Sequence, residues 1–359
     1  MRLGATTRLS VTTRLSVTTR LSVTTRLSVT TQLGVTTRMG RAAAGGDPQP
    51  LTWATPRSPA SGMFGVIAFA SHRSSPAPRA RTTFPDHADM FQVIAPCPAL
   101  APYVNGYWFV QDLEGVYEGQ AIETCPYPGA VLSVNFGRPN AMEGGPTVPR
   151  VSLLGFQSSS RRWRSWSDTY FVMAMLSGIG LARLFPGIGA DCKDRLMDLA
   201  AYLGDGTACS LAADLSAAWA PRRIASQLDA WLLRRLDATR APIELPTLAA
   251  AHALLRQGQQ VQDIARLTAV NRRQLHRWFE RHLGVGPKQL MDLERLQSSI
   301  QAVQRGDGDA LSGYSDQAHQ IRNWRRRLAQ TPSGYARGGP SPLAEYFGRQ
   351  PGEGPAFYL

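Results

Sequence analysis

The residues best suited to chemistry in this 359-residue chain form two runs rich in arginine, glutamine and histidine, within 271–288 and 317–326. In the major groove of DNA, arginine forms paired hydrogen bonds with guanine, and glutamine does so with adenine. Both runs therefore predict contacts with double-stranded DNA. The candidate contact residues are Asn271, Arg272, Arg273, Gln274, His276, Arg277, Lys288, Gln317, His319, Gln320, Arg322 and Arg326.

Helices must present the first run to DNA. Apolar residues at helical spacing predict two short helices within 248–268. A three-residue corner at 269–271 follows, and its asparagine is placed to cap a third helix. This arrangement of a short helix, a corner and an arginine-rich helix predicts a helix-turn-helix motif. The inward-facing residues of the third helix are expected to be Leu275, Trp278 and Phe279.

The same order of features recurs 45 residues later. Gly313-Tyr-Ser315 is the second corner, and Trp324 takes the place of Phe279. In each copy a proline follows the inward aromatic residue by eight positions, at Pro287 and at Pro332. A long helix beginning at Pro287 is predicted to hold the two motifs at a fixed separation.

Basic residues beside the motifs are suited to phosphate contacts. Lys288, Arg326 and Arg327 would position the protein on DNA without specifying its sequence. Residues 251–340 hold fourteen basic and seven acidic residues, a net charge of +7. Much of the whole-chain charge of +13 lies elsewhere, because residues 1–89 hold eleven arginines and three acids.

These features resemble the AraC-type regulators. The resemblance covers about residues 250–337 and implies a DNA-binding domain of a sequence-specific transcriptional regulator. A second resemblance, within 90–240, is to the front domain of one branch of the family and implies no particular ligand. The motifs that carry the first are Ile264-Ala265, Arg272-Arg-Gln-Leu-His-Arg-Trp-Phe279, Gly284-Val-Gly-Pro287, Arg295-Leu-Gln297, Gly313-Tyr-Ser-Asp-Gln-Ala-His319 and Thr331-Pro-Ser-Gly-Tyr335; those of the second are Tyr107-Trp108, Val134-Asn-Phe136 and Gly180-Leu-Ala-Arg-Leu-Phe185.

Three departures from the family pattern bear on the second motif and on the corners. Ala269 stands where the first corner usually has glycine, and Ala329 replaces the glycine after the second arginine-rich helix. Only residues 305–312 precede the second corner, where the family has a full helix, and Gly306 and Gly308 oppose helix formation there. We therefore expect the second motif to lack its supporting helix.

The front of the folded chain predicts β structure. Short β-branched or aromatic runs at 130–136, 150–156 and 169–175 are typical of a sandwich or barrel. Helical spacing follows, through 191–203 and from Pro221 onward. The predicted fold class is α+β: a β-rich N-terminal sensor-like domain, then an all-α C-terminal domain with two helix-turn-helix motifs, the second shortened. The predicted boundaries are 1–89 for a disordered or non-native extension, 90–240 for an α/β regulatory domain, 241–247 for a linker, 248–338 for the DNA-binding domain and 339–359 for a C-terminal tail.

The extension repeats the hexad Arg-Leu-Ser-Val-Thr-Thr from Arg8, Arg14, Arg20 and Arg26. One leucine and one valine per unit cannot form a core, so we expect this segment to be disordered or absent from the natural product. An organelle transit peptide and a hexapeptide β-solenoid are the alternatives.

No catalytic constellation is apparent in residues 90–245: the sequence shows no suggestive carboxylate pair, glycine-rich phosphate loop or histidine cluster. We therefore expect no enzyme. Trp108, Trp163, Trp166 and Tyr170 either pack in the core or line a small-molecule pocket. Two other readings stay open: an enzyme domain fused to a DNA-binding tail, and a non-DNA-binding interaction protein derived from a regulator.

The four cysteines, Cys97, Cys125, Cys192 and Cys209, form no Cys-x-x-Cys pair and are expected to be small buried residues with free thiols in a reducing cytoplasm. No metal site and no cofactor are expected. No apolar run reaches the ~18 residues needed to cross a bilayer, so no membrane partner is expected. Besides double-stranded DNA, a small-molecule effector, a second copy forming a homodimer and RNA polymerase are the candidate partners.

Overall fold

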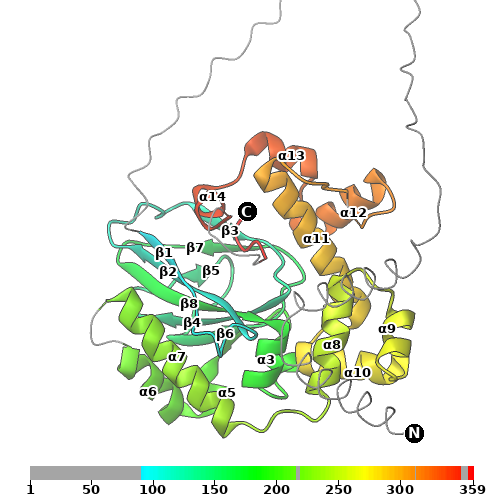
Figure 1. Cartoon of the computed structure of the whole chain (residues 1–359). Coiled ribbons are helices and arrows are strands. Elements are labelled where there is room, and N and C mark those ends of the chain that lie inside the picture. The colour runs from blue at the N-terminus through cyan, green and yellow to red at the C-terminus, as the bar shows by residue number, and fades with distance from the viewer. Residues whose placement is uncertain (1–89, 216–218, 312, 349–354) are drawn as a thin grey trace, which may run out of the picture. The chain divides into compact units, whose positions relative to one another are not determined.

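The computed structural model describes residues 90–215, 219–311, 313–348 and 355–359, drawn in colour in Figure 1. The predictions for residues 1–89 lie outside the described residues. The described chain begins with strands and ends with helices, and this confirms the predicted α+β class. The proposed domain boundaries stay predictions.

A six-stranded antiparallel sheet forms the centre of the β-rich region, with strand order β1-β2-β8-β4-β6-β9. The predicted strands at 130–136, 150–156 and 169–175 are confirmed as β4, β6 and β8. The strands of this sheet are β1 (Phe91–Ile94), β2 (Val104–Asp112), β4 (Gly129–Asn135), β6 (Val151–Leu154), β8 (Thr169–Ser177) and β9 (Leu196–Asp198).

A second sheet of three strands faces the first and has the order β3-β7-β5. Its strands are β3 (Ala121–Thr124), β7 (Arg161–Arg164) and β5 (Ala141–Met142). Alternate residues of β4 belong to different cores: Val131 packs in the cluster between the sheets, whereas Leu132 and Val134 pack on the other face. This period of two follows from the strand pleat, which sends successive side chains to opposite faces.

Helices cover the second face of the six-stranded sheet (Figure 1). Pro221 occupies the first turn of α7, as predicted. The predicted helical stretch 191–203 was partly wrong, because strand β9 interrupts it and pairs with β6. These helices are α3 (Gly178–Leu184), α4 (Gly189–Cys192), α5 (Leu199–Leu203), α6 (Asp205–Leu215) and α7 (Pro221–Ala238).

The remaining elements are helices. The first of them begins at Leu245, inside the stretch 241–247 that we predicted to be linker. The cluster of buried side chains beneath the sheet continues without a break into α8, α9, α10 and α11. The helices are α8 (Leu245–Arg256), α9 (Val261–Leu267), α10 (Arg272–Leu283), α11 (Pro287–Arg305), α12 (Gln317–Leu328), α13 (Pro332–Gly338) and α14 (Pro342–Gly348).

The four thiols are free, but they are not all buried. Cys125 and Cys192 are buried, and burial raises the pKa of each thiol to about 12. Cys97 is half-buried and Cys209 is exposed, so the expectation of burial was wrong for Cys209. Among the described helices, none is long and apolar enough to span a membrane.

Candidate functional site

Helices α9 and α10 form the first helix-turn-helix motif around a short corner. Asn271 caps α10, because its side-chain oxygen accepts a hydrogen bond from the backbone N–H of Gln274 at 2.8 Å. Leu275 and Phe279 are fully buried, as predicted. Trp278 is only half-buried and packs at the edge of the same core. The cap and the two buried residues fix which face of α10 remains outside.

The outer face of α10 is strongly basic. Arg272, Arg273 and Arg277 are all exposed, and so is His276. Gln274 is half-buried, and its side-chain oxygen accepts a hydrogen bond from the Arg277 guanidinium. The guanidiniums of Arg272 and Arg273 have no such intrahelical partner among the described contacts, so both are placed to reach a base edge.

Both alanines that depart from the family pattern have left-handed backbone. Ala269 has a φ of 54° at the first corner, and Ala329 has a φ of 55° at the end of α12. A residue with a Cβ atom pays about 1 kcal/mol for this conformation, which glycine adopts freely. Both departures from the family pattern therefore coincide with left-handed backbone.

The second motif lacks its supporting helix, as expected. No helix lies between α11 and α12 in the described part of residues 306–316. Asp316 caps α12 by accepting a hydrogen bond from the N–H of His319 at 2.7 Å, and this bond lowers the pKa of the carboxyl group. Trp324 is fully buried, and its indole N–H donates to Ser299 of α11 at 3.0 Å. The shortened motif thus packs its α12 directly on α11.

Two predicted contact residues of α12 turn inward. Gln320 is 4% exposed, and its amide nitrogen donates to Ser299 Oγ at 3.0 Å and to the carbonyl of Ala310 at 2.7 Å. Because a loop replaces the supporting helix between α11 and α12, the Gln320 amide holds this loop in place through the carbonyl of Ala310. Arg327 is also buried and donates to the carbonyl of Ser158 at 2.7 Å. Neither side chain is available to DNA in this arrangement.

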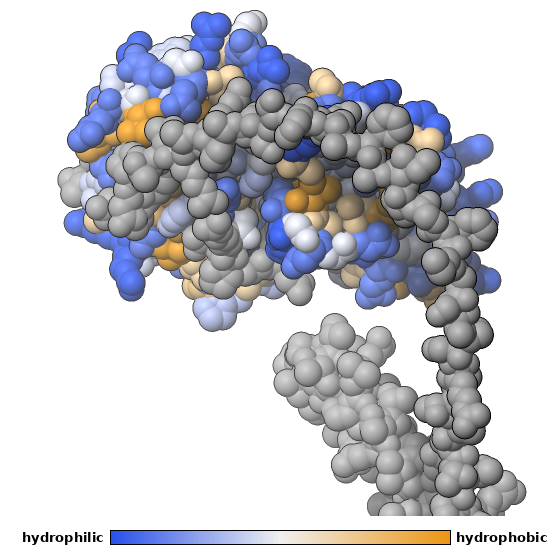
Figure 2. Space-filling view, turned by 90° about the horizontal axis from the view of Figure 1, so that it is seen from above, coloured by the Kyte–Doolittle hydropathy of each residue, from blue (hydrophilic) through white to orange (hydrophobic). Residues whose placement is uncertain are grey.

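The other candidates on α11 and α12 remain accessible. Gln317, Arg322, Arg326 and Lys288 are exposed, and His319 is half-buried. Figure 2 shows one face of the molecule, and the described residues visible there are mostly hydrophilic, with smaller hydrophobic patches. The accessible candidates therefore belong to both motifs.

The end of α10 packs against α4 of the β-rich region. Gly189 of α4 lies against the backbone of His282, and a Cβ atom added at Gly189 would come within 2.3 Å of it. His282 is 3% exposed and bonds to Glu244 at 2.8 Å, and this bond is the main cause that lowers the pKa of Glu244. A change in the β-rich region can therefore reach α10 through direct contact.

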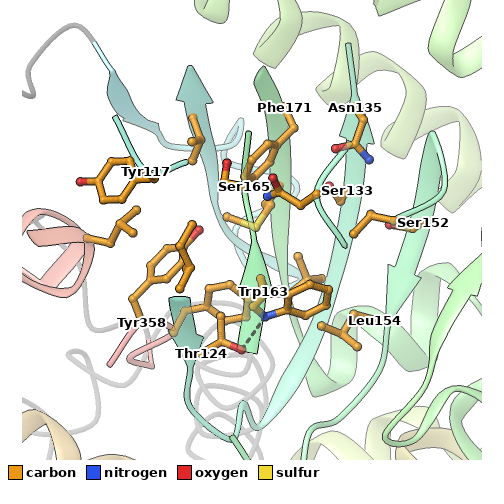
Figure 3. Close-up of a pocket in the computed structure, with 18 of the residues that line it drawn as sticks. Tyr117, Thr124, Ser133, Asn135, Ser152, Leu154, Trp163, Ser165, Phe171 and Tyr358 are labelled. Carbon is orange, nitrogen blue, oxygen red and sulfur yellow. Dashed lines mark hydrogen bonds between the residues drawn. The ribbon is translucent and has the colours of Figure 1, made fainter. Parts of the chain in front are cut away.

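A cavity lies between the two sheets (Figure 3). Of the four aromatic residues predicted to line a pocket, only Trp163 does so, and its indole N–H donates to Thr124 at 3.0 Å. Trp108 instead stacks on Phe347. Tyr170 packs against Trp219, and Trp166 lies under the guanidinium of Arg138. Sequence spacing could not assign these rings to one face or the other.

The cavity wall is mainly apolar, with polar groups gathered at one side. Ser133, Asn135 and Ser152 contribute these groups from β4 and β6. Ser152 is 1% exposed, and its hydroxyl has no hydrogen-bond partner among the described residues. Asp112 is the one charged residue among the described lining residues, and its carboxylate accepts the N–H groups of Val116 and Tyr117 at 2.8 and 2.9 Å. At the wall of a cavity, such a hydroxyl can bond to a water molecule or to a polar group of a ligand.

Comparison with known proteins gives the class of the helical region. Residues 264–338 match the family model described as "Helix-turn-helix domain". This part of the chain is a helix-turn-helix domain of the AraC type, as the order of its motifs predicted. No curated protein matches the sequence.

Solved structures also match. ToxT from Vibrio cholerae O395 is 12% identical, with 66% of this chain and 97% of that chain covered and a TM-score of 0.33. ToxT from Vibrio cholerae strain SCE256, bound to an unsaturated fatty acid, is 13% identical, with 64% and 94% covered and a TM-score of 0.35. The AraC-like transcriptional activator CuxR is 15% identical, with 62% and 90% covered and a TM-score of 0.20.

Proposed function

We propose that this chain is a sequence-specific DNA-binding transcriptional regulator that reads the major groove chiefly with α10. The observation that carries the proposal is the exposed basic face of a capped helix within a domain of the AraC type. Arg272, Arg273 and His276 face outward there, and Arg273 is the principal base-reading candidate. A helix of this kind fits the width of the major groove.

The second motif has a smaller role in this proposal. Gln317 and Arg322 of α12 contact DNA, with His319 at the margin, whereas Gln320 keeps its internal hydrogen bonds. Lys288 and Arg326 contact phosphates and set the orientation of the protein. The first motif then supplies most of the sequence preference, and the second supplies mainly affinity.

The cavity between the sheets is the proposed site of a small-molecule effector. Its apolar wall and its few convergent polar groups match the general character of ligand pockets. The contact of Gly189 with the end of α10 offers a route by which the β-rich region alters the first motif. Self-association and contact with RNA polymerase are compatible with this function.

The proposal is tested by selecting bound fragments from genomic DNA with the full chain, at several salt concentrations. We expect a small set of fragments sharing one motif, with affinity falling steeply as salt rises, because each phosphate contact releases counterions. The same selection with Arg272, Arg273 and His276 all replaced by alanine should recover no shared motif. Recovery of the same motif by this variant would contradict reading by α10, and no binding by either protein would contradict a DNA-binding function.

A further inference from the structure

The residues that close the cavity between the sheets come from the end of the sequence. Leu343 of α14 lines the cavity together with Phe357 and Tyr358. In Figure 3, Tyr358 enters from the side opposite Asn135 and Ser152. All three residues are at most 5% exposed, so they form part of the wall and not a loose cover.

Backbone hydrogen bonds hold these residues at the edge of the smaller sheet. The N–H of Cys125 donates to the carbonyl of Phe357 at 2.9 Å, and the N–H of Leu359 donates to the carbonyl of Glu123 at 3.0 Å. Tyr358 pairs with Thr124 as an antiparallel bridge beside β3. Residues 357–359 therefore add to the β3 edge of the smaller sheet, and addition of a strand to a sheet edge is a common way for a peptide to bind.

Aromatic contacts complete this closure. Phe347 of α14 stacks on Trp108 at 4.3 Å between ring centroids, and Tyr358 lies 5.4 Å from Phe347. The free space left in the cavity is about 70 Å³. Pockets for small molecules commonly have roughly 300–1,000 Å³. Phe357 and Tyr358 therefore take up part of the room that such a molecule would need.

The same residues are tied to the helix that joins the two motifs. Gln304 of α11 donates to the carbonyl of Tyr358 at 2.9 Å, and Gln297 of α11 donates to the carbonyl of Ala356 at 3.0 Å. Leu359 is buried in the same cluster as Trp324 of α12. Removing residues 355–359 from the cavity would therefore also uncover the core of the second motif.

Resting on the proposed effector-regulated function, we propose that Phe357 and Tyr358 occupy the effector site as a tethered competitor, and that an effector releases them from both the cavity and α11. The effector class is a neutral, largely apolar molecule with one or two hydrogen-bonding groups. Aromatic and aliphatic side chains form most of the wall, and Ser152 offers an unpartnered hydroxyl. No lysine, arginine or histidine is present among the described lining residues to pair with an anionic ligand.

The first experiment measures binding of N-phenylnaphthylamine, a neutral apolar fluorophore, to the full chain and to the Phe357→Ala/Tyr358→Ala variant. If Phe357 and Tyr358 are out of the cavity in about one molecule in ten, only that tenth of the unaltered chain can bind the probe. The variant should therefore bind the probe about tenfold more tightly. Anilinonaphthalene sulfonate, a related anion, should bind more weakly than the neutral probe. Ser133→Leu, which fills the cavity from β4, should weaken binding of the neutral probe.

A second measurement uses the unaltered chain, so it does not depend on how the variants fold. Hydrogen exchange at the amides of Cys125 and Leu359 should become faster when N-phenylnaphthylamine is added. Slower exchange at these amides, or weaker binding by the variant, would overturn the proposal by making these residues part of the ligand site. Absence of probe binding to the chain and to the variant would overturn it as well. None of these readouts involves DNA, so failure here is distinct from failure of the DNA-binding function.

Discussion

At the scale of single residues, Arg273 carries the sharpest expectation. Its replacement by alanine should cost about 1–3 kcal/mol of binding free energy on the preferred DNA site and should relax the preference at one base pair. The reason is that a paired hydrogen bond to a base edge depends on which base is present. Competition binding against single-base variants of the selected site measures both effects.

The matched control is Arg326→Ala on α12. Arg326 is exposed and is proposed to contact phosphate, so its loss should weaken binding to all sequences alike and lower the salt dependence by about one counterion. If Arg273→Ala instead weakens random DNA as much as the preferred site, Arg273 is a phosphate contact and base reading must be assigned elsewhere on α10.

Gln320 shows why residue type alone does not assign a role. Its amide has the chemistry that suits an adenine edge, and it lies on an arginine-rich helix. The structure gives the same amide two internal acceptors, Ser299 and Ala310. The loop that stands in place of a helix before α12 needs such a donor, and a buried amide is costly to leave without partners.

At the scale of elements, the contact between α4 and α10 joins the β-rich region to the first motif. Gly189→Ala should destabilise the protein by about 1–3 kcal/mol, because the new methyl group would meet the backbone of His282 at 2.3–2.4 Å. Backbone atoms cannot move aside as a flexible side chain can, so the two helices must separate. Urea unfolding of the full chain measures the change in the free energy of unfolding.

Gly206→Ala is the matched control for this prediction. Gly206 lies in α6, and a Cβ atom added there would have no neighbour within 4 Å. The same chemical change should therefore be neutral or should stabilise the helix by up to about 1 kcal/mol. Equal unfolding free energies for the two variants would show that the close approach of α4 and α10 does not limit the stability of the protein.

At the scale of the whole molecule, the second motif is not a self-contained unit. Its core of Trp324, Leu328 and Leu296 also includes Cys125 and Leu359, which lie outside the predicted DNA-binding domain of residues 248–338. The backbone of Ser160 adds a further contact, because its N–H donates to the carbonyl of Arg327 at 2.8 Å. The front region and the end of the sequence thus support α12 together.

A fragment of residues 248–338 should consequently hold α12 less firmly. We expect hydrogen exchange of the α12 amides to be at least about tenfold faster in this fragment than in the full chain, since local stability follows buried apolar contact. Mass spectrometry after timed labelling measures the rates. Equal protection of α12 in both proteins would mean that the contacts with Cys125, Ser160 and Leu359 are dispensable.

Local features of this protein were predictable because their causes lie within a few residues. The β-branched apolar run that formed β4 and the helical spacing that formed α10 are properties of consecutive side chains. The cap at Asn271 and the left-handed backbone at Ala269 follow from the corner itself. The match of the helical region to an AraC-type domain has the same basis, because it depends on the order of such local features.

The paired arginine-rich helices, the AraC-type region and the missing support of the second motif were determined by the sequence alone. Only the tertiary structure decided that Gln320 and Arg327 turn inward, that Trp163 alone among four candidates lines the cavity, and that Tyr358 closes it. Each of these outcomes joins residues far apart in the chain, as Tyr358 and Thr124 are. Such contacts depend on how whole elements pack, and no local pattern of residue types encodes that packing.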